Sequence, residues 1–282
     1  MKLFNSIFNK NKNITFNNQT LRDAVKEWLK NPKKATSKYG HISSWDTSKV
    51  TDMSKLFLDA NTFNEPLNNW DVSNVSNMHA MFDNAYVFNQ PLDNWDVSNV
   101  TDMSEMFSSM EALVFNQQLN NWDVSNVNNM CAMFSGAEAF NQPIGNWDVS
   151  KVTNMHEMFA DATSFNQDIG NWDVSKVTNM HEMFADATSF NQDIGNWDIR
   201  KVADMSNMFE NAKSFNQPIE NWVSQKVIEE EVVLRDKNEF PKEEINNQKE
   251  LEHAQNKVDN LTKLIESDPN DANLFFNRGY YK

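Results

Sequence analysis

Apolar residues recur along most of the chain with a period of 25 residues. Segment 151–173 is identical to segment 176–198, and one interval between repeats is 27 residues long because two additional residues lie near Met110. Such an insertion predicts a surface loop. A fixed period of this length is typical of proteins built from stacked repeats. The tryptophans that mark the period are Trp45, Trp70, Trp95, Trp122, Trp147, Trp172, Trp197 and Trp222.

Two apolar spacings alternate within each repeat. The apolar residues of segment 155–162 stand at i, i+3, i+4 and i+7, which predicts a short amphipathic helix. Those of segment 169–177 follow the spacing of a leucine-rich-repeat strand, with Trp172 in a leucine position. One coil cannot bury its own apolar faces, so neighbouring coils must stack. The sequence therefore predicts an α/β repeat solenoid over residues 42–227, a leucine-rich-repeat-like stack of short parallel strands and short helices.

The segments flanking the repeats differ from them. Segment 1–41 contains a predicted capping helix at about 20–30, with Thr20 and Asp23 in capping-box spacing and Asn31-Pro32 as its end. Its apolar face is expected to seal the first coil, and the lysines on its other side to face water. Segment 228–282 is highly charged and predicts a helical tail. The expected apolar face of the capping helix comprises Leu21, Val25, Trp28 and Leu29.

Composition narrows the classes of function. Most of the 9 Trp, 15 Met and 20 Phe residues fall in repeat columns, which predicts buried stacks rather than sugar platforms or copper sites. A single cysteine excludes an intramolecular disulfide framework. The formal charge of −15 argues against nucleic acid as a partner. No apolar run is long enough to cross a bilayer, and the absence of a clear signal peptide favours the cytoplasm.

The repeat unit FNQDIGNWDVSKVTNMHEMFADATS resembles the BspA-like leucine-rich-repeat family, and segment 39–57 resembles that family's usual first repeat. This resemblance implies a non-catalytic, ligand-binding module of the bacterial surface or secreted type, often linked to adhesion. The final segment, DPNDANLFFNRGYYK, resembles part of a tetratricopeptide repeat. That second resemblance gives an alternative, an intracellular scaffold that combines the repeat array with tetratricopeptide peptide binding.

The aspartate that follows tryptophan forms the column with the strongest candidate chemistry. If tryptophan points inward, the next side chain on a strand points outward, together with the serine two residues further on. Three interpretations remain open: structural Asx turns, a strip that binds a basic protein or other macromolecule, and a divalent-cation site. The candidate ligand face comprises Asp71, Asp96, Asp123, Asp148, Asp173, Asp198, Ser150 and Ser175.

The remaining polar columns favour structural roles. Asparagines after the second phenylalanine of each repeat, such as Asn141 and Asn166, can form ladders that satisfy backbone groups. His156, His181 and Cys131 share one position on the predicted helix, where solvent exposure explains them better than metal binding. No nucleophile–base constellation or phosphate loop appears, so we expect no enzyme activity, no cofactor and no metal.

Overall fold

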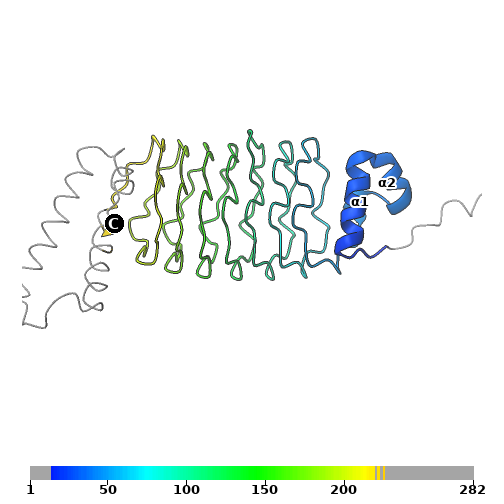
Figure 1. The fold of residues 1–282 in the computed structure, drawn as a ribbon, viewed down its shortest axis with the longest axis horizontal. Helices are drawn as coiled ribbons and strands as arrows, with labels where there is room; N and C mark the ends of the chain where they lie inside the picture. The colour runs from blue at the N-terminus through cyan, green and yellow to red at the C-terminus, as the bar shows by residue number, and fades with distance from the viewer. Residues whose placement is uncertain (1–13, 220, 223–224, 226–282) are drawn as a thin grey trace, which may run out of the picture.

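The repeats form a single elongated stack of similar coils, closed at one end by two helices (Figure 1). A computed structural model describes residues 14–219, 221–222 and 225. In the described chain, helix α1 (Asn18–Lys30) and helix α2 (Pro32–Tyr39) precede a short 3-10 turn, η1 (Ile42–Ser44), and the coils follow. The predicted tail at 228–282, with its tetratricopeptide-like end, lies outside the described residues.

The predicted α/β solenoid of short strands and short helices is wrong. From 45 to 219 the coils contain neither an α-helix nor an extended strand, and consist of consecutive turns joined by isolated parallel β-bridges such as Asn154 to Asn179. In the representative coil, the N–H of Met158 donates to Met155 O at 3.2 Å, and that of Ala160 donates to Glu157 O at 3.1 Å. These i→i+3 bonds replace the i→i+4 bonds of the predicted helix.

The other amides of the same segment donate to the next coil. Glu157 N donates to His181 O at 2.9 Å, and Glu182 N donates to Ser206 O at 3.0 Å. Because His181 O and Glu182 N belong to one peptide unit, the bonds connect head to tail along the stack. Amides that bond within the coil thus alternate with amides that bond to the next coil. Glu157 and Glu182, which donate to the next coil, have left-handed backbone, both with φ 53°. A coil of this kind satisfies part of its backbone only through its neighbours, which is why the repeats must stack.

The predicted strand at 169–177 is also made of turns. Trp172 N donates to Ile169 O at 3.1 Å and Val177 N donates to Val174 O at 2.9 Å, so these amides bond within the coil. The tryptophan ring makes the cross-coil bond instead, because Trp172 Nε1 donates to Ile144 O at 3.2 Å. Turn geometry at both segments explains why the apolar spacings predicted burial correctly and secondary structure incorrectly.

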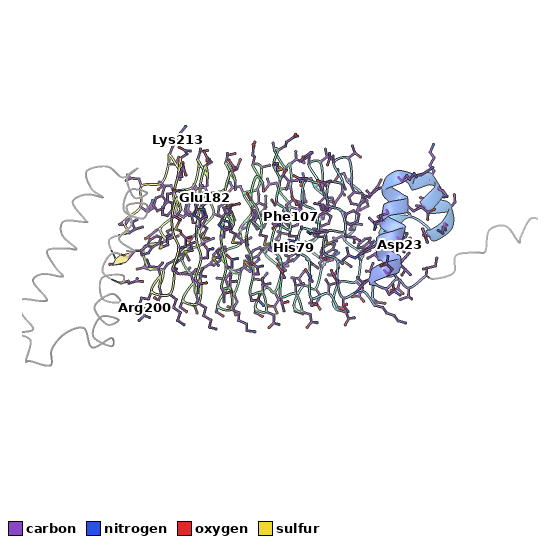
Figure 2. The ribbon with its side chains drawn as sticks, viewed as in Figure 1. Asp23, His79, Phe107, Glu182, Arg200 and Lys213 are labelled. Carbon is purple, nitrogen blue, oxygen red and sulfur yellow. The ribbon has the colours of Figure 1, made fainter. Side chains whose placement is uncertain are left out.

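The core consists of columns of identical side chains. The prediction that the Trp, Met and Phe columns are buried is confirmed: Met155, Met158 and Phe159 are all 0% exposed. Ring centroids of Phe159 and Phe184 lie 5.7 Å apart, and those of Trp147 and Trp172 lie 6.5 Å apart with nearly parallel planes. Figure 2 places Phe107 inside the stack, while Lys213 and Arg200 project from its two opposite long edges. Each ring is thus covered by the rings of the neighbouring coils. A terminal coil lacks a neighbour on one side and therefore needs a cap.

Helix α1 provides this cap, as predicted, although its start and one apolar contact differ from expectation. The N-cap is Asn17, and Thr20 is the N3 residue of the capping box rather than its first member. Leu21, Val25 and Trp28 are buried as expected. Leu29 is 42% exposed, because it lies next to the buried face instead of on it. Asn31 ends α1 and caps α2, with Pro32 in the first turn of α2, where its missing N–H costs nothing.

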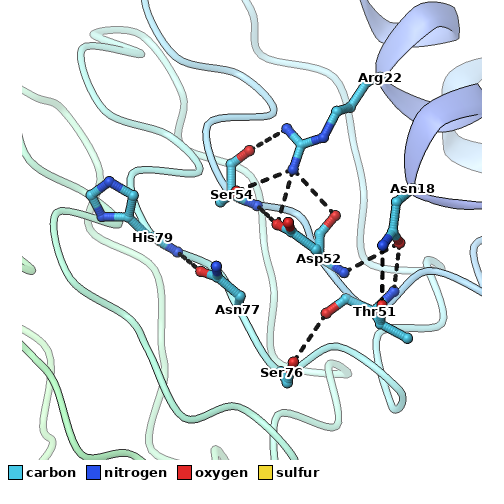
Figure 3. Close-up of polar contacts among 8 residues, drawn as sticks. All are labelled: Asn18, Arg22, Thr51, Asp52, Ser54, Ser76, Asn77 and His79. Atoms are coloured by element: carbon cyan, nitrogen blue, oxygen red, sulfur yellow. Dashed lines mark hydrogen bonds and ion pairs between the residues drawn. The ribbon is translucent and has the colours of Figure 1, made fainter.

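Side chains of α1 complete the hydrogen bonds of the first coil (Figure 3). Asn18 Oδ1 accepts the N–H of Thr51 at 2.8 Å, a bond that a preceding coil provides elsewhere in the stack. Arg22 donates to the carbonyl oxygens of Asp52 and Ser54, and its Nη2 lies 2.9 Å from Asp52 Oδ1. A guanidinium therefore meets the carbonyl end of the aligned peptide units, as cations do at the C-terminus of a helix.

Candidate functional site

The aspartates that follow tryptophan form a strip on the outside of the coils, hereafter the Asp strip. Each carboxylate accepts the amide of the residue two positions later, which is serine except at Asp198, where it is Arg200: Ser73 N lies 3.1 Å from Asp71 Oδ1, and Ser175 N lies 3.1 Å from Asp173 Oδ1. These Asx turns bear out the structural part of the prediction. The strip comprises Asp71, Asp96, Asp123, Asp148, Asp173 and Asp198, with Ser150 and Ser175 beside it.

Hydrogen bonds favour the ionised form of two carboxylates in the middle of the Asp strip. Hydrogen bonds from the Ser125 hydroxyl and amide lower the pKa of Asp123, and those from Ser150 lower the pKa of Asp148 in the same way. The amide of Ser125 donates to Asp123 Oδ1 at 3.0 Å. At Asp198 both oxygens have partners, because Arg200 Nη2 donates to Oδ2 at 2.5 Å while the Arg200 amide donates to Oδ1.

Neighbouring side chains divide the strip into two halves, a feature that the sequence prediction missed. In the first half, the residue after the serine is asparagine; Asn99 and Asn126, for example, donate to Ser73 O and Ser98 O of the preceding coil. In the second half the same position is lysine, and the field of Lys151 and Lys176 contributes to the lowered pKa of Asp148. The signal was present in the 25-residue column, which changes from asparagine to Lys151, Lys176 and Lys201. The charge of Lys151 also acts on Asp123, so the carboxylates without a lysine in their own coil or the next are Asp71 and Asp96.

The asparagine ladder predicted at the coil corners is confirmed. Asn141 Oδ1 accepts the backbone N–H of Asn166 at 3.0 Å and the side-chain amide of Gln167 at 2.8 Å. The same pair of bonds connects Asn116 to Asn141 one coil earlier. Because the amide oxygen is occupied twice, this column is structural.

The histidines of the shared column make more contacts than expected for residues on an exposed helix. The rings of His156 and His181 stack with centroids 5.0 Å apart. Nδ1 of His156 lies 3.1 Å from His181 O, and its Nε2 lies 3.1 Å from Glu157 Oε1. His181 repeats both contacts, with Ser206 and Glu182. Both nitrogens of each ring therefore face an oxygen atom of a neighbouring residue.

Cys131 occupies the same column and is chemically quiet. Burial, together with the fields of Glu105, Glu157 and Asp102, raises the pKa of its thiol to about 11, so the reactive thiolate is scarce at neutral pH. Within the described part of the chain, no group of three or more His, Cys, Asp or Glu side chains could hold a metal ion. None of the helices described there is long and apolar enough to pass through a membrane.

Taken together, the stacked coils and the polar columns on their surface define a tandem-repeat protein with a buried aromatic interior. The family model described as "Mycoplasma protein of unknown function, DUF285" matches residues 23–145, 110–171 and 139–248. Since these matches together cover most of the chain, the protein belongs to this family. No curated protein matches the chain, and no solved structure matches it.

Proposed function

We propose that the protein is a non-catalytic binding module of the bacterial surface, of the adhesion type, and that it contacts a basic macromolecule through its Asp strip. The observation that carries this proposal is the display of one ionised carboxylate per coil on a backbone fixed by Asx turns. The resemblance of the repeat unit to BspA-like surface proteins and the family membership are compatible with it. The polar side chains repeat from coil to coil, which suits an extended contact better than a single reaction centre.

The division of the strip supports the first half as the place where a basic partner would bind. Coils with Asp71, Asp96 and Asp123 present carboxylates beside neutral asparagines. Later coils present the same carboxylates beside lysines that repel a cationic partner. Binding is therefore expected to concentrate on the first half of the strip.

Two triple variants of the full chain test this expectation. One replaces Asp71, Asp96 and Asp123 by Asn, and the matched control replaces Asp148, Asp173 and Asp198 by Asn. Asparagine retains the Oδ1 acceptor of each turn, so both variants should fold. With an immobilised oligolysine peptide as the probe, the first triple is expected to weaken binding about ten-fold and the control about two-fold. Equal losses, or no loss in either variant, would refute the role of the strip.

The location of the protein requires a separate measurement. Protease treatment of intact producing cells should release peptides from the repeat array if the array lies at the surface. Complete protection until the cells are lysed would instead support the intracellular scaffold. A cytosolic marker protein, followed in the same samples, controls for leakage.

A further inference from the structure

Exposed apolar side chains are concentrated at one corner of the stack. Of the four large apolar residues that are markedly exposed in the described chain, Val87, Met110 and Val114 lie in two consecutive coils. Val87 and Val114 precede the second phenylalanine of their repeats, a position that holds serine, threonine or alanine in the other coils. These other residues are Thr62, Ala139, Ser164, Ser189 and Ser214. The apolar residues are thus a local departure from the repeat.

This corner, hereafter the insertion corner, contains the two additional residues of the longer repeat. In the register of the repeat, Leu113 of this corner corresponds to Lys213, and Lys213 projects from the edge opposite to that of Arg200, which follows the last aspartate of the Asp strip (Figure 2). Met110 is 92% exposed, whereas the methionines of the repeat columns are buried. A large apolar side chain displayed to this extent is unusual unless another molecule covers it.

The backbone of the insertion corner is nevertheless fixed from both sides. Met110 N donates to Asn84 Oδ1 at 3.0 Å, and Val114 N donates to Tyr86 O at 3.2 Å in the preceding coil. In the following coil, Ser135 O accepts the N–H of Ser109 at 2.8 Å. Met110 is therefore displayed on an ordered support, and a partner that binds it need not order the loop first.

Gly136 of the following coil makes room for this loop. A Cβ atom at Gly136 would lie 2.0 Å from Ser109 O, which no side chain tolerates. The equivalent positions hold Asp161 and Asp186 in later coils, where no insertion is present. Because Gly136 has no side chain, the inserted loop can lie against it, and Met110 stands exposed next to this contact.

Two acidic residues adjoin the insertion corner: Asn84, whose Oδ1 accepts the N–H of Met110, donates its Nδ2 to Asp59 Oδ1 at 3.2 Å, and Glu111 directly follows Met110. Burial raises the pKa of Asp83 to about 6, with further contributions from the nearby charges of Glu105 and Asp59. The charges of Glu111, Asp59 and Asp83 also act on the Tyr86 hydroxyl. A cationic group that arrives here would relieve the repulsion among these carboxylates.

We propose that the insertion corner is a docking site for a protein segment that places apolar side chains on Val87, Met110 and Val114 and lysine or arginine beside Asp59 and Glu111. An apolar centre with a charged rim is the usual anatomy of such a contact. This site goes beyond the Asp strip: it lies on the opposite edge and requires apolar as well as basic groups.

The side chain of Met110 provides the test. The full chain is labelled at its methionine methyl groups and titrated, in separate NMR experiments, with short peptides of alternating leucine and lysine, leucine and glutamate, or glycine and lysine. Only the leucine–lysine peptide should shift the Met110 resonance in a saturable way. An equal shift with either of the other peptides would overturn the proposal.

Variants separate the two parts of the site. Replacing Val87 and Val114 by Ser installs a residue that this column carries in other coils, and should weaken binding of the leucine–lysine peptide about ten-fold. Replacing Asp59 by Asn and Glu111 by Gln should weaken it to a similar extent. Leu29→Ser removes an exposed apolar side chain far from the corner and should change nothing. Unchanged affinity in either double variant would refute the site.

Occupation of the corner by the chain itself is tested by oxidation. Mild hydrogen peroxide should convert Met110 to its sulfoxide well before the core methionines, as peptide mapping of the intact protein by mass spectrometry would reveal. Protection of Met110 in the free protein would mean that another part of the chain covers it, and the proposal would fail. Because this test does not involve the Asp strip, its failure would leave the proposed function standing.

Discussion

Arg22 is expected to hold the capping helix on the first coil, and its replacement by methionine tests how the stack ends. Methionine retains an unbranched apolar stem and removes the guanidinium. The variant loses the contacts with the Ser54 and Asp52 carbonyls, the 2.9 Å ion pair with Asp52 and the 3.1 Å bond to Ser54 Oγ. No other described residue supplies these donors to the first coil.

The expected loss of stability in Arg22→Met depends on how far Arg22 and its partners are exposed to solvent. A hydrogen bond to a charged partner contributes about 1.5–3 kcal/mol when it is buried, and an exposed ion pair contributes about 0.2–1 kcal/mol. The Arg22 and Asp52 side chains are 26% and 41% exposed, so solvent screens the ion pair, and the bonds to the carbonyl oxygens are also only partly buried. Arg22→Met should therefore lower the free energy of unfolding by about 2 kcal/mol.

Urea denaturation followed by tryptophan fluorescence measures this loss, because Trp28 and Trp45 lie at the interface between the cap and the first coil. Lys26→Met is the matched control, since it removes an exposed charge from the same helix, and it should cost less than about 0.5 kcal/mol. Arg22→Lys keeps the charge without the planar fork and should fall between the two. If Arg22→Met and Lys26→Met are equally stable, the capping argument is wrong.

Three further changes test other parts of the structure. Asp83→Asn should stabilise the protein by about 1–2 kcal/mol at pH 7 and have no effect below about pH 4. Because the pKa of Asp83 is raised in the folded protein, folding favours the protonated acid, and the stability of the wild type falls as pH rises towards 6. Urea titrations at several pH values measure this dependence. Asn141→Ala leaves the N–H of Asn166 without its acceptor and should cost about 1–3 kcal/mol in thermal or urea unfolding, whereas the same change at the exposed Asn171 should cost little. Gly136→Ala should cost about 2–3 kcal/mol, because Cβ would collide with the inserted loop; a stability equal to that of wild type would refute the close approach.

Much of the candidate site could be predicted from the periodicity of the sequence. A column of identical residues identifies the same position in every coil whatever the backbone does, so the Asp strip and the asparagine ladder could be found from spacing. The outward direction of the Asp strip was right, although its argument used a strand that the structure replaces with turns. The prediction missed the lysines beside the second half of the strip, although the column change at Lys151 is visible in the sequence. It also placed His156 and His181 on an open helix surface, because ring contacts with the next coil depend on a backbone that was not anticipated.

The sequence by itself determined the 25-residue repeat, the burial of tryptophan, methionine and phenylalanine in columns, and the helix that precedes the first coil. Only the tertiary structure decided how the backbone satisfies its hydrogen bonds. Segment 155–162 has helical spacing, yet stacking offers its amides acceptors in the next coil, so turns with left-handed residues such as Glu157 replace the helix. The apolar pattern predicts which side chains face the core. The backbone conformation between them depends on hydrogen bonds to the neighbouring coil.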